Sequence, residues 1–229
     1  MGNLILVRHG QSLWNLENRF TGWTNVDLSA QGIEEAQRVG QLFKENHIDL
    51  DICFSSYLKR AIRTQWTILE NADQMHVDCL YHWKLNERYY GDWQGLDKDE
   101  VLRDFGEENY WAIRRGFDVP PPPLSLEDKR HPQYDSNYKN LEAHLLPSTE
   151  SLKDTQLRVV NYFYEAIVPQ LSLDKTVLVT AHGNSLRALI ANLGHIAEND
   201  VPHIDVPTGT PFLYEFDGML NLMSHQKLS

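Results

Sequence analysis

Near its N-terminus the chain reads LILVRHG over residues 4–10, and near its C-terminus it reads VLVTAHG over residues 177–183. Each stretch is a short apolar run that ends in a histidine followed by a glycine. Such runs are typical of buried strands in a parallel sheet. Functional residues of open α/β sheets collect outside the carboxyl ends of the strands. The two stretches therefore predict that His9 and His182 form a catalytic pair at one edge of a sheet.

Strand-like and helix-like segments alternate along most of the chain. This alternation predicts a helix-flanked, mainly parallel sheet, that is, a three-layer α/β/α fold, and we treat residues 1–229 as one domain. Residues 85–147, which include a Pro run, interrupt the pattern and predict a largely helical and loop insertion that acts as a lid. Residues 218–229 are expected to be loosely held. Further predicted strands are 51–54, 75–79 and 211–216, and predicted helices are 30–46 (with Ser29 as N-cap), 56–70, one from 150 onward (entered through Ser148 or Thr149) and 184–193.

Composition narrows the classes of partner. The formal net charge of −11 argues against nucleic acid, whose binding needs a basic face. No apolar run approaches the roughly 20 residues that span a bilayer, and Cys53 and Cys79 do not form a disulfide framework. We therefore expect a cytoplasmic protein that binds neither nucleic acid nor membrane. A small anion remains a suitable ligand, because a cleft can be locally positive in an acidic protein.

The residues around His9 suit phosphate chemistry. The Arg8 guanidinium offers a planar fork of donors that matches phosphate oxygens, and Gly10 lets the backbone approach a ligand closely. A neutral imidazole between them is a candidate nucleophile. For this tripeptide alone the alternative is a solvent-facing arginine beside a structural histidine.

Other charged residues also favour a phosphate group as the ligand. Arg60 is predicted in the first turns of a helix that directly follows a strand, where the helix N-terminus also favours anions. Glu87 is a candidate general acid/base, and its alternative is an ordinary ion pair with Arg88. Arg114 and Arg115 are either an exposed basic pair or cations that a lid brings over an anion.

Several stretches together resemble one known family. They are LVRHGQS (6–12), NRFTGW (18–23), LKRA (58–61), LNER (85–88), AHGNSLR (181–187) and PTGTP (207–211). On these residues the chain resembles the cofactor-dependent phosphoglycerate mutases of the histidine phosphatase superfamily. The resemblance covers nearly the whole chain, including the insertion.

The resemblance implies interconversion of 3-phosphoglycerate and 2-phosphoglycerate, a step of glycolysis and gluconeogenesis. His9 would carry the phosphoryl group after priming by 2,3-bisphosphoglycerate, and Glu87 would move the proton. His182, Arg8 and Arg60 would stabilise the transferring group. Residues implied to bind the rest of the substrate, a small phosphorylated sugar acid, are Asn15, Thr21, Gly22, Tyr90, Lys98, Arg114, Arg115, Gly183 and Asn184.

The resemblance also implies that no metal is needed, because arginines neutralise the phosphate charge. The ten histidines form no close ligand cluster in the sequence, which agrees with this and argues against a metal-dependent hydrolase. A homodimer or homotetramer is the implied assembly.

The chain departs from the family pattern at a few positions. Gln11 stands where the family usually has Glu, and Tyr89 stands where it has His. The pair Asp92–Trp93 is bulkier and more acidic than usual. We expect Tyr89 to lie beside the proposed acid/base, where it would slow transfer, perturb the acid/base or shift the balance toward hydrolysis.

The sequence is also compatible with two other functions. One is a histidine-type phosphatase that acts on bisphosphoglycerate or another phosphoester. The other is a non-catalytic paralogue that binds phosphorylated metabolites.

Overall fold

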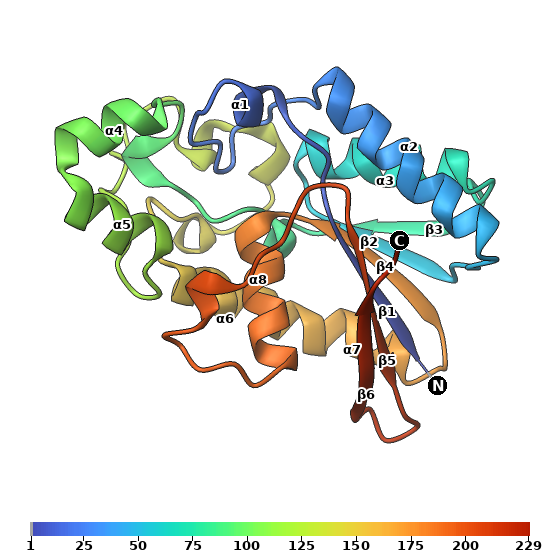
Figure 1. Ribbon diagram of the computed structural model, residues 1–229. Helices are drawn as coiled ribbons and strands as arrows, with labels where there is room; N and C mark the ends of the chain where they lie inside the picture. The colour runs from blue at the N-terminus through green and yellow to red at the C-terminus, as the bar shows by residue number, and fades with distance from the viewer. Residues whose placement is uncertain (1) are drawn as a thin grey trace.

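The computed structural model describes residues 2–229, and within them six strands form one mixed sheet (Figure 1). Their order across the sheet is β3-β2-β4-β1-β5-β6. Strands β3, β2, β4 and β1 pair in parallel, whereas β5 pairs antiparallel with both β1 and β6. The strands are β1 (Asn3–Arg8), β2 (Ile52–Ser55), β3 (Asp78–Tyr81), β4 (Thr176–Ala181), β5 (Pro211–Phe216) and β6 (Leu222–Lys227). The mainly parallel sheet predicted from the alternation is confirmed.

Helices cover both faces of this sheet, which confirms the three layers. They are α1 (Leu13–Leu16), α2 (Ala30–Glu45), α3 (Lys59–Asn71), α4 (Lys98–Phe105), α5 (Glu107–Arg115), α6 (Leu152–Tyr162), α7 (Val168–Leu171) and α8 (Gly183–Leu193). A π-helical turn, Phe163–Ile167, joins α6 to α7. Ser29 caps α2 as predicted, because its side chain accepts the N–H of Gly32.

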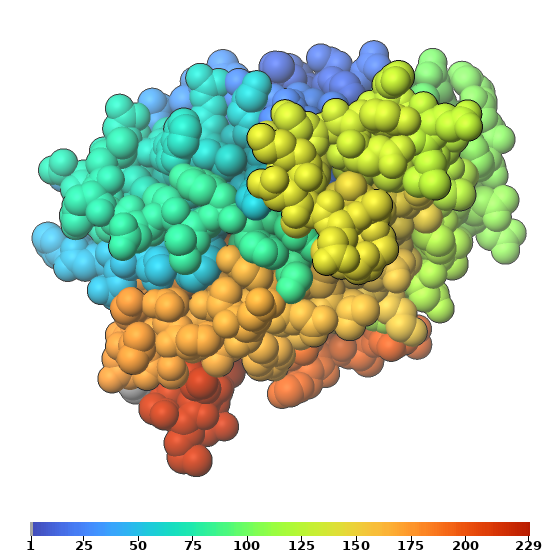
Figure 2. Space-filling view, turned by 180° about the vertical axis from the view of Figure 1, so that it is seen from behind, coloured from blue at the N-terminus to red at the C-terminus, as the bar shows by residue number. Residues whose placement is uncertain are grey.

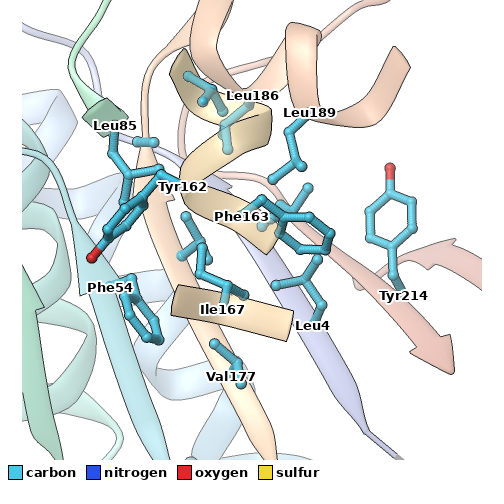
Figure 3. Close-up of a cluster of buried hydrophobic side chains, with 14 of the residues drawn as sticks. Leu4, Phe54, Leu85, Tyr162, Phe163, Ile167, Val177, Leu186, Leu189 and Tyr214 are labelled. Carbon is cyan, nitrogen blue, oxygen red and sulfur yellow. The ribbon is translucent and has the colours of Figure 1, made fainter. Parts of the chain in front are cut away.

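Strand β1 shows why the core has two halves. Successive side chains of a strand point to opposite faces. Leu4 and Leu6 accordingly pack against α6, the π-helical turn and α8 (Figure 3). Ile5 and Val7 pack against α2 and α3 on the other face. All four side chains are fully buried, as expected for a central strand that is covered on both sides.

The insertion lies between β3 and α6 and adds no strand to the sheet. Helices α4 and α5 stand on the left of Figure 1, away from the two termini. The rest consists of loops and short 3-10 turns at Trp83–Leu85, Gly91–Trp93, Pro132–Tyr134, Ser136–Tyr138 and Ala143–Leu145. Seen from behind, its yellow part is a continuous mass against the turquoise and orange segments (Figure 2). Two rings of the insertion, Tyr89 and Tyr138, join Trp23 and Trp83 in a separate aromatic cluster.

Several element boundaries differ from the sequence prediction. The third strand is Asp78–Tyr81 rather than 75–79, because its pairing with β2 begins at the match of Ile52 with Asp78. Helix α3 begins at Lys59, three residues later than Ser56, whose hydroxyl accepts the N–H of Leu58. Helix α6 begins after Ser151, which forms a capping box with Asp154, and not after Ser148 or Thr149.

The prediction of a loosely held tail was wrong. Residues 222–227 form β6 and pair with β5 from Phe212 to Phe216. Their side chains are mostly exposed, so the sequence of this edge strand lacks the apolar pattern that signals burial. Tertiary pairing with β5 supplies the order instead.

Candidate active site

The two histidine tripeptides lie side by side, as their positions after two strands predict. Arg8 is in register with Ala181 between β1 and β4, and the His9 N–H donates to the Ala181 carbonyl at 3.0 Å. The rings of His9 and His182 have centroids 5.0 Å apart with 60° between their planes. Both rings are buried.

Hydrogen bonds select one tautomer for His9. Its Nδ1 lies 2.6 Å from the Gly10 carbonyl, which can only accept, so Nδ1 carries the proton. The Nε2 atom accepts from Nε of Arg60 at 3.2 Å and therefore bears the lone pair. Burial, followed by the positive charges of Arg60 and Arg8, holds the pKa of His9 well below its usual value. His9 is thus a neutral imidazole at neutral pH.

His182 is also neutral, for the same reason. Burial first, and then the charge of Arg60, lowers its pKa well below the usual value. Its Nε2 lies 2.7 Å from Oγ of Ser56. The same oxygen accepts the N–H of Leu58, and because a hydroxyl has one proton and two lone pairs it fits His182 with the ring proton on either nitrogen. Within residues 2–229, Nδ1 is buried without a hydrogen-bond partner.

Backbone carbonyls hold the arginines around the two histidines. Arg60 donates to the carbonyls of Gly22 and Thr24 at 2.9 and 3.0 Å. Arg8 donates to the carbonyl of Val206 at 2.8 Å. Burial lowers the pKa of Arg60 to about 10 and also lowers that of Arg8, but both groups stay protonated at neutral pH. These contacts fix two cations beside His9, of which Arg60 is buried and Arg8 half-buried.

Glu87 lies at the N-terminus of α8 and does not pair with Arg88. Its Oε1 accepts the backbone N–H groups of Arg88 and Asn184 at 2.8 and 3.1 Å. The positive end of the helix dipole favours a carboxylate at this place. The alternative of an ordinary Glu87–Arg88 ion pair is therefore wrong.

The Arg88 side chain instead caps the end of α5. It donates to the carbonyls of Ile113 and Arg114 at 3.1 and 3.2 Å. A cation at a helix C-terminus satisfies free carbonyls and opposes the negative end of the dipole. The residue next to Glu87 therefore also fixes the segment that carries Arg114 and Arg115.

One cavity of about 210 Å³ joins most of the predicted site residues. It is lined by Arg8, His9, Asn15, Arg19, Phe20, Thr21, Gly22, Arg60, Glu87, Tyr90, Lys98, Arg114, Arg115, Gly183, Asn184 and Arg187. Seven of these residues are arginine or lysine, and Glu87 is the one carboxylate among them. His182 is not among these lining residues, and its ring packs against that of His9. The cavity thus brings together most of the residues that the sequence singled out, and Arg114 and Arg115 both line it, with Arg115 still exposed.

The sequence analysis assigned no role to three lining residues, Arg19, Phe20 and Arg187. Arg187 follows Asn184 by three positions on α8, so the two share a helix face. Its NH1 donates to Oδ1 of Asn184 at 2.7 Å, and its Nε donates to the carbonyl of Ile204 at 3.1 Å. Helical spacing from Asn184 would have identified it. Arg19 and Phe20 belong to the quoted stretch 18–23, but their spacing alone predicts no role.

Two lining residues of the insertion are electrostatically coupled to their neighbours. Burial raises the pKa of the Tyr90 phenol, but the positive charge of Arg88 and the hydrogen bonds from Arg88 and Asn184 together outweigh this, so the net shift is downward. The Tyr90 hydroxyl accepts from Nδ2 of Asn184 at 3.0 Å. Burial, with the charge of Arg114, lowers the pKa of Lys98. The insertion therefore contributes two side chains, Tyr90 and Lys98, whose pKa values depend on neighbouring arginines.

A buried ion pair holds the segment that carries Glu87. Nε of Arg158 lies 2.6 Å from Oε1 of Glu150, and both side chains are less than a tenth exposed. The remaining donors of Arg158 bind the carbonyls of Lys84, Asn86 and Glu87, each at 2.8 Å. Oε2 of Glu150 accepts the N–H of Tyr89 at 2.7 Å. One ion pair thus binds the backbone of residues 84–89 at four points.

The departures from the family pattern lie outside the cavity. Tyr89 is fully buried and packs edge-on against Trp23, with centroids 5.6 Å apart, in the aromatic cluster of the insertion. Its hydroxyl donates to the carbonyl of Arg130 at 3.3 Å. The expectation that Tyr89 lies beside the acid/base was therefore wrong, because its ring packs into the aromatic cluster with Trp23, while Tyr90 lines the cavity with Glu87. Oε1 of Gln11 accepts from Ser29 at 2.8 Å and does not line the cavity.

Over residues 2–229, no group of three or more His, Cys, Asp or Glu side chains is arranged to hold a metal ion. No helix in the same range is long and apolar enough to cross a membrane.

The sequence is similar to those of known proteins. The model of the histidine phosphatase superfamily (branch 1) matches residues 4–131. The chain is 53% identical over 222 residues to a 2,3-bisphosphoglycerate-dependent phosphoglycerate mutase of Nautilia profundicola, and the match covers 97% of each chain.

Solved structures of low sequence identity share the fold. A mycobacterial glucosyl-3-phosphoglycerate phosphatase, solved with VO3, is similar with a TM-score of 0.74 and 20% identity, covering 99% of this chain and 97% of that one. YhfR of Bacillus stearothermophilus is similar with a TM-score of 0.73 and 20% identity, covering 96% and 94%.

Removing one partner of the buried ion pair is expected to destabilise the protein strongly. Arg158→Met leaves the Glu150 carboxylate buried and unpaired, which typically costs about 3–5 kcal/mol of unfolding free energy. The matched control is Arg103→Met, because Arg103 is exposed and pairs with Asp104. It is expected to cost less than about 1 kcal/mol. Urea unfolding measures both, and equal losses would contradict a special role for the buried pair.

The buried histidines predict a loss of stability in mild acid. In the unfolded chain their rings take up protons near pH 6.5, whereas in the folded protein the lowered pKa values keep His9 and His182 neutral. The unfolded state therefore binds more protons, and the unfolding free energy falls as the pH drops below about 6.5. Each ring contributes at most about 1.4 kcal/mol per pH unit. Thermal unfolding between pH 7.5 and 5.5 measures the trend.

His82 provides the control for this pH dependence. Burial lowers its pKa to about 4, and its ring stacks on Tyr162 outside the cavity. His82→Phe retains the stacking and removes one titrating ring, so the slope of stability against pH is expected to become shallower. A midpoint that does not change with pH in the wild type would contradict neutral buried histidines.

Proposed function

The chain belongs to the histidine phosphatase superfamily and, within it, to the cofactor-dependent phosphoglycerate mutases, and from this we propose that it interconverts 3-phosphoglycerate and 2-phosphoglycerate. The reaction is an isomerisation by phosphoryl transfer in glycolysis and gluconeogenesis. The observation that carries the proposal is the small cavity in which seven cationic side chains and one carboxylate surround a neutral histidine. In a protein of net charge −11 this concentration of positive charge favours a small, multiply charged anion.

His9 is the proposed nucleophile. Its Nε2 lone pair needs no base to release it, because the ring is neutral and its proton resides on Nδ1. The bond from Nδ1 to the Gly10 carbonyl keeps this tautomer and stabilises positive charge that develops on the ring during attack. When the N–P bond forms, the bond from phosphorus to the substrate oxygen breaks.

Arg8, Arg60 and His182 are proposed to stabilise the transferring phosphoryl group. Such transfer depends mainly on positioning and electrostatics. The two guanidiniums are already fixed by backbone carbonyls, so little reorganisation is needed during the reaction. With its ring proton on Nδ1, which has no hydrogen-bond partner within residues 2–229, His182 is a further donor for a phosphoryl oxygen on the adjacent His9.

Glu87 is the proposed general acid/base. Its Oε1 is occupied by two backbone N–H groups, which leaves Oε2 for the hydroxyl that gains or loses the phosphoryl group. As the protonated acid, Glu87 donates its proton to the leaving oxygen in one direction, and as the carboxylate it accepts the hydroxyl proton in the other. The ion pair of Arg158 and Glu150 keeps it in position.

The remaining cavity residues are proposed to bind the far end of the substrate. Tyr90, Lys98, Arg114 and Arg115 come from the insertion and form a second cationic group within the same cavity. Asn15, Thr21, Gly22, Gly183 and Asn184 offer neutral hydrogen-bonding groups there. A carboxylate and a second phosphate fit this set.

We propose 2,3-bisphosphoglycerate as the primer on the same grounds. It supplies the phosphoryl group that loads His9. Its three anionic groups match cations at both ends of the cavity, and a volume of about 210 Å³ is below the 300–1,000 Å³ typical of sites for larger ligands. No metal is expected, because arginines supply the compensating charge.

Two observations favour transfer over hydrolysis. The insertion contributes two arginines and a lysine to the cavity, which retain a sugar acid while His9 is loaded. Arg88 ties the arginine-bearing end of α5 to Glu87, so the insertion forms a lid that excludes water from the phosphohistidine.

One assay separates the mutase from both alternatives. The protein is incubated with 3-phosphoglycerate, with and without 2,3-bisphosphoglycerate, while 2-phosphoglycerate and free phosphate are followed. We expect isomerisation that depends on the bisphosphate, with little phosphate released. Phosphate release without isomerisation would identify a phosphatase, and binding without turnover would identify a non-catalytic paralogue.

Two variants test the proposed roles in the same assay. His9→Ala is expected to abolish phosphoryl labelling of the protein. Glu87→Gln is expected to slow turnover by at least about 100-fold, in line with the usual effect of a general acid/base, and to leave substrate binding largely intact. Full activity in the His9 variant would overturn the mechanism.

Tyr89→His tests whether this departure from the family matters for the reaction. The side chain lies in the aromatic cluster, so we expect the ratio of isomerisation to phosphate release to change by less than about twofold. The melting temperature should fall, because a polar ring replaces a buried aromatic ring, which typically costs about 1–3 kcal/mol. A large shift toward isomerisation would mean that residue 89 acts on the site.

Location and assembly complete the proposal. We propose a cytoplasmic enzyme, since the proposed reaction uses phosphorylated metabolites and Cys53 and Cys79 are both free thiols. A homodimer or homotetramer is expected, and light scattering after size exclusion measures the mass directly.

A further inference from the structure

Thr64 lies on α3, one turn after Arg60, and is fully buried. Its hydroxyl donates to the Arg60 carbonyl at 2.8 Å, a local bond that threonines often form in helices. The same hydroxyl also accepts the N–H of Gly10 at 3.1 Å. This second bond reaches across 54 positions of sequence to the residue directly after His9.

These bonds belong to a closed circuit around the His9 ring. The ring donates from Nδ1 to the Gly10 carbonyl, and the Gly10 N–H donates to Thr64. Thr64 donates to the backbone of Arg60, and the Arg60 side chain donates to Nε2 of the ring. Both nitrogens of the imidazole are therefore oriented by residues that the Thr64 hydroxyl connects.

From this circuit we infer that Thr64 is a positioning residue for His9, which sets the direction and the tautomer of the imidazole through Gly10 and Arg60. The inference deepens the proposed function, since it concerns the proposed nucleophile. It follows from geometry: the Gly10 carbonyl can fix the Nδ1–H tautomer only while Gly10 is held in place. Thr64 holds Gly10 at its N–H, and Glu35 holds the carbonyl's own peptide through the N–H of Gln11 at 2.9 Å. The site is buried, so water does not replace the hydroxyl.

The alternative is that Thr64 only satisfies a buried N–H and so contributes to stability. Thr155 allows the two roles to be distinguished. It is also fully buried, and its hydroxyl donates to the Ser151 carbonyl four positions earlier at 3.0 Å. No hydrogen bond of Thr155 leads to His9. Thr155→Val therefore reproduces the loss of the same local bond away from the circuit.

The test compares Thr64→Val, Thr64→Ser and Thr155→Val in the full-length protein. Valine retains the shape of threonine and removes the hydroxyl, and serine retains the hydroxyl. We expect Thr64→Val to lower kcat about 10–100-fold with KM changed less than about threefold, as for a misplaced reacting group. Thr64→Ser should remain within about threefold of wild type, and Thr155→Val should retain wild-type kcat. If the valine variant does not fold, Thr64→Ala replaces it.

A second measurement does not depend on turnover. In protein labelled with ¹⁵N-histidine, two-bond ¹H–¹⁵N spectra report the tautomer of each ring, and the signals of His9 are those missing from His9→Asn. We expect the Nδ1–H form in wild type and Thr64→Ser, and a mixture of tautomers in Thr64→Val. A wild-type His9 spectrum in Thr64→Val would overturn the inference, even if kcat had fallen.

The two measurements separate the inference from the proposed function. An inactive wild type with the tautomer change in Thr64→Val would refute the mutase and support the positioning role. Equal loss of kcat in Thr64→Val and Thr155→Val would refute the positioning role and leave the mutase intact.

Discussion

The arrangement of this molecule follows from the need to hold several guanidinium groups close to a neutral histidine. Like charges repel, and burial weakens the solvation of each one, so every buried arginine needs a fixed acceptor. Backbone carbonyls fill that role: Gly22 and Thr24 for Arg60, Val206 for Arg8, and Ile204 for Arg187. The acceptors come from loops far apart in sequence, so the paths of these loops depend on the arginines they bind.

The same arrangement explains how the insertion is joined to the sheet. Arg158 and Glu150 bind the backbone of residues 84–89 just before and after Glu87. Arg88 then binds the carboxyl end of α5. Positions of Glu87 and of the insertion's arginines are therefore coupled through one short segment. A shift of the cations that the insertion contributes to the cavity would therefore also move the Glu87 carboxylate.

Much of the fold and of the site could be predicted, because the responsible signals are local. Buried strands such as residues 4–7 have apolar runs, and Ser29 has the chemistry of an N-cap. The predictions that were wrong concern elements with weak local signals. Strand β6 is mostly exposed and gains its order from pairing with β5. Tyr89 is next to Tyr90 in sequence, but the two side chains lie on opposite sides of the segment, which sequence distance does not reveal.

By itself, the sequence determined the chemical groups that are available and the elements that carry them, because residue types and periodicity are properties of the chain. It placed His9 and His182 after two apolar runs and identified the cations that meet around them. Only the tertiary structure decided which atom of each group faces which partner. The Nδ1–H tautomer of His9, the carboxylate of Glu87 on the end of α8 and the link from Thr64 to Gly10 all join distant residues. Such contacts depend on hydrogen-bond direction over a few ångströms, and this geometry exists only once the chain is folded.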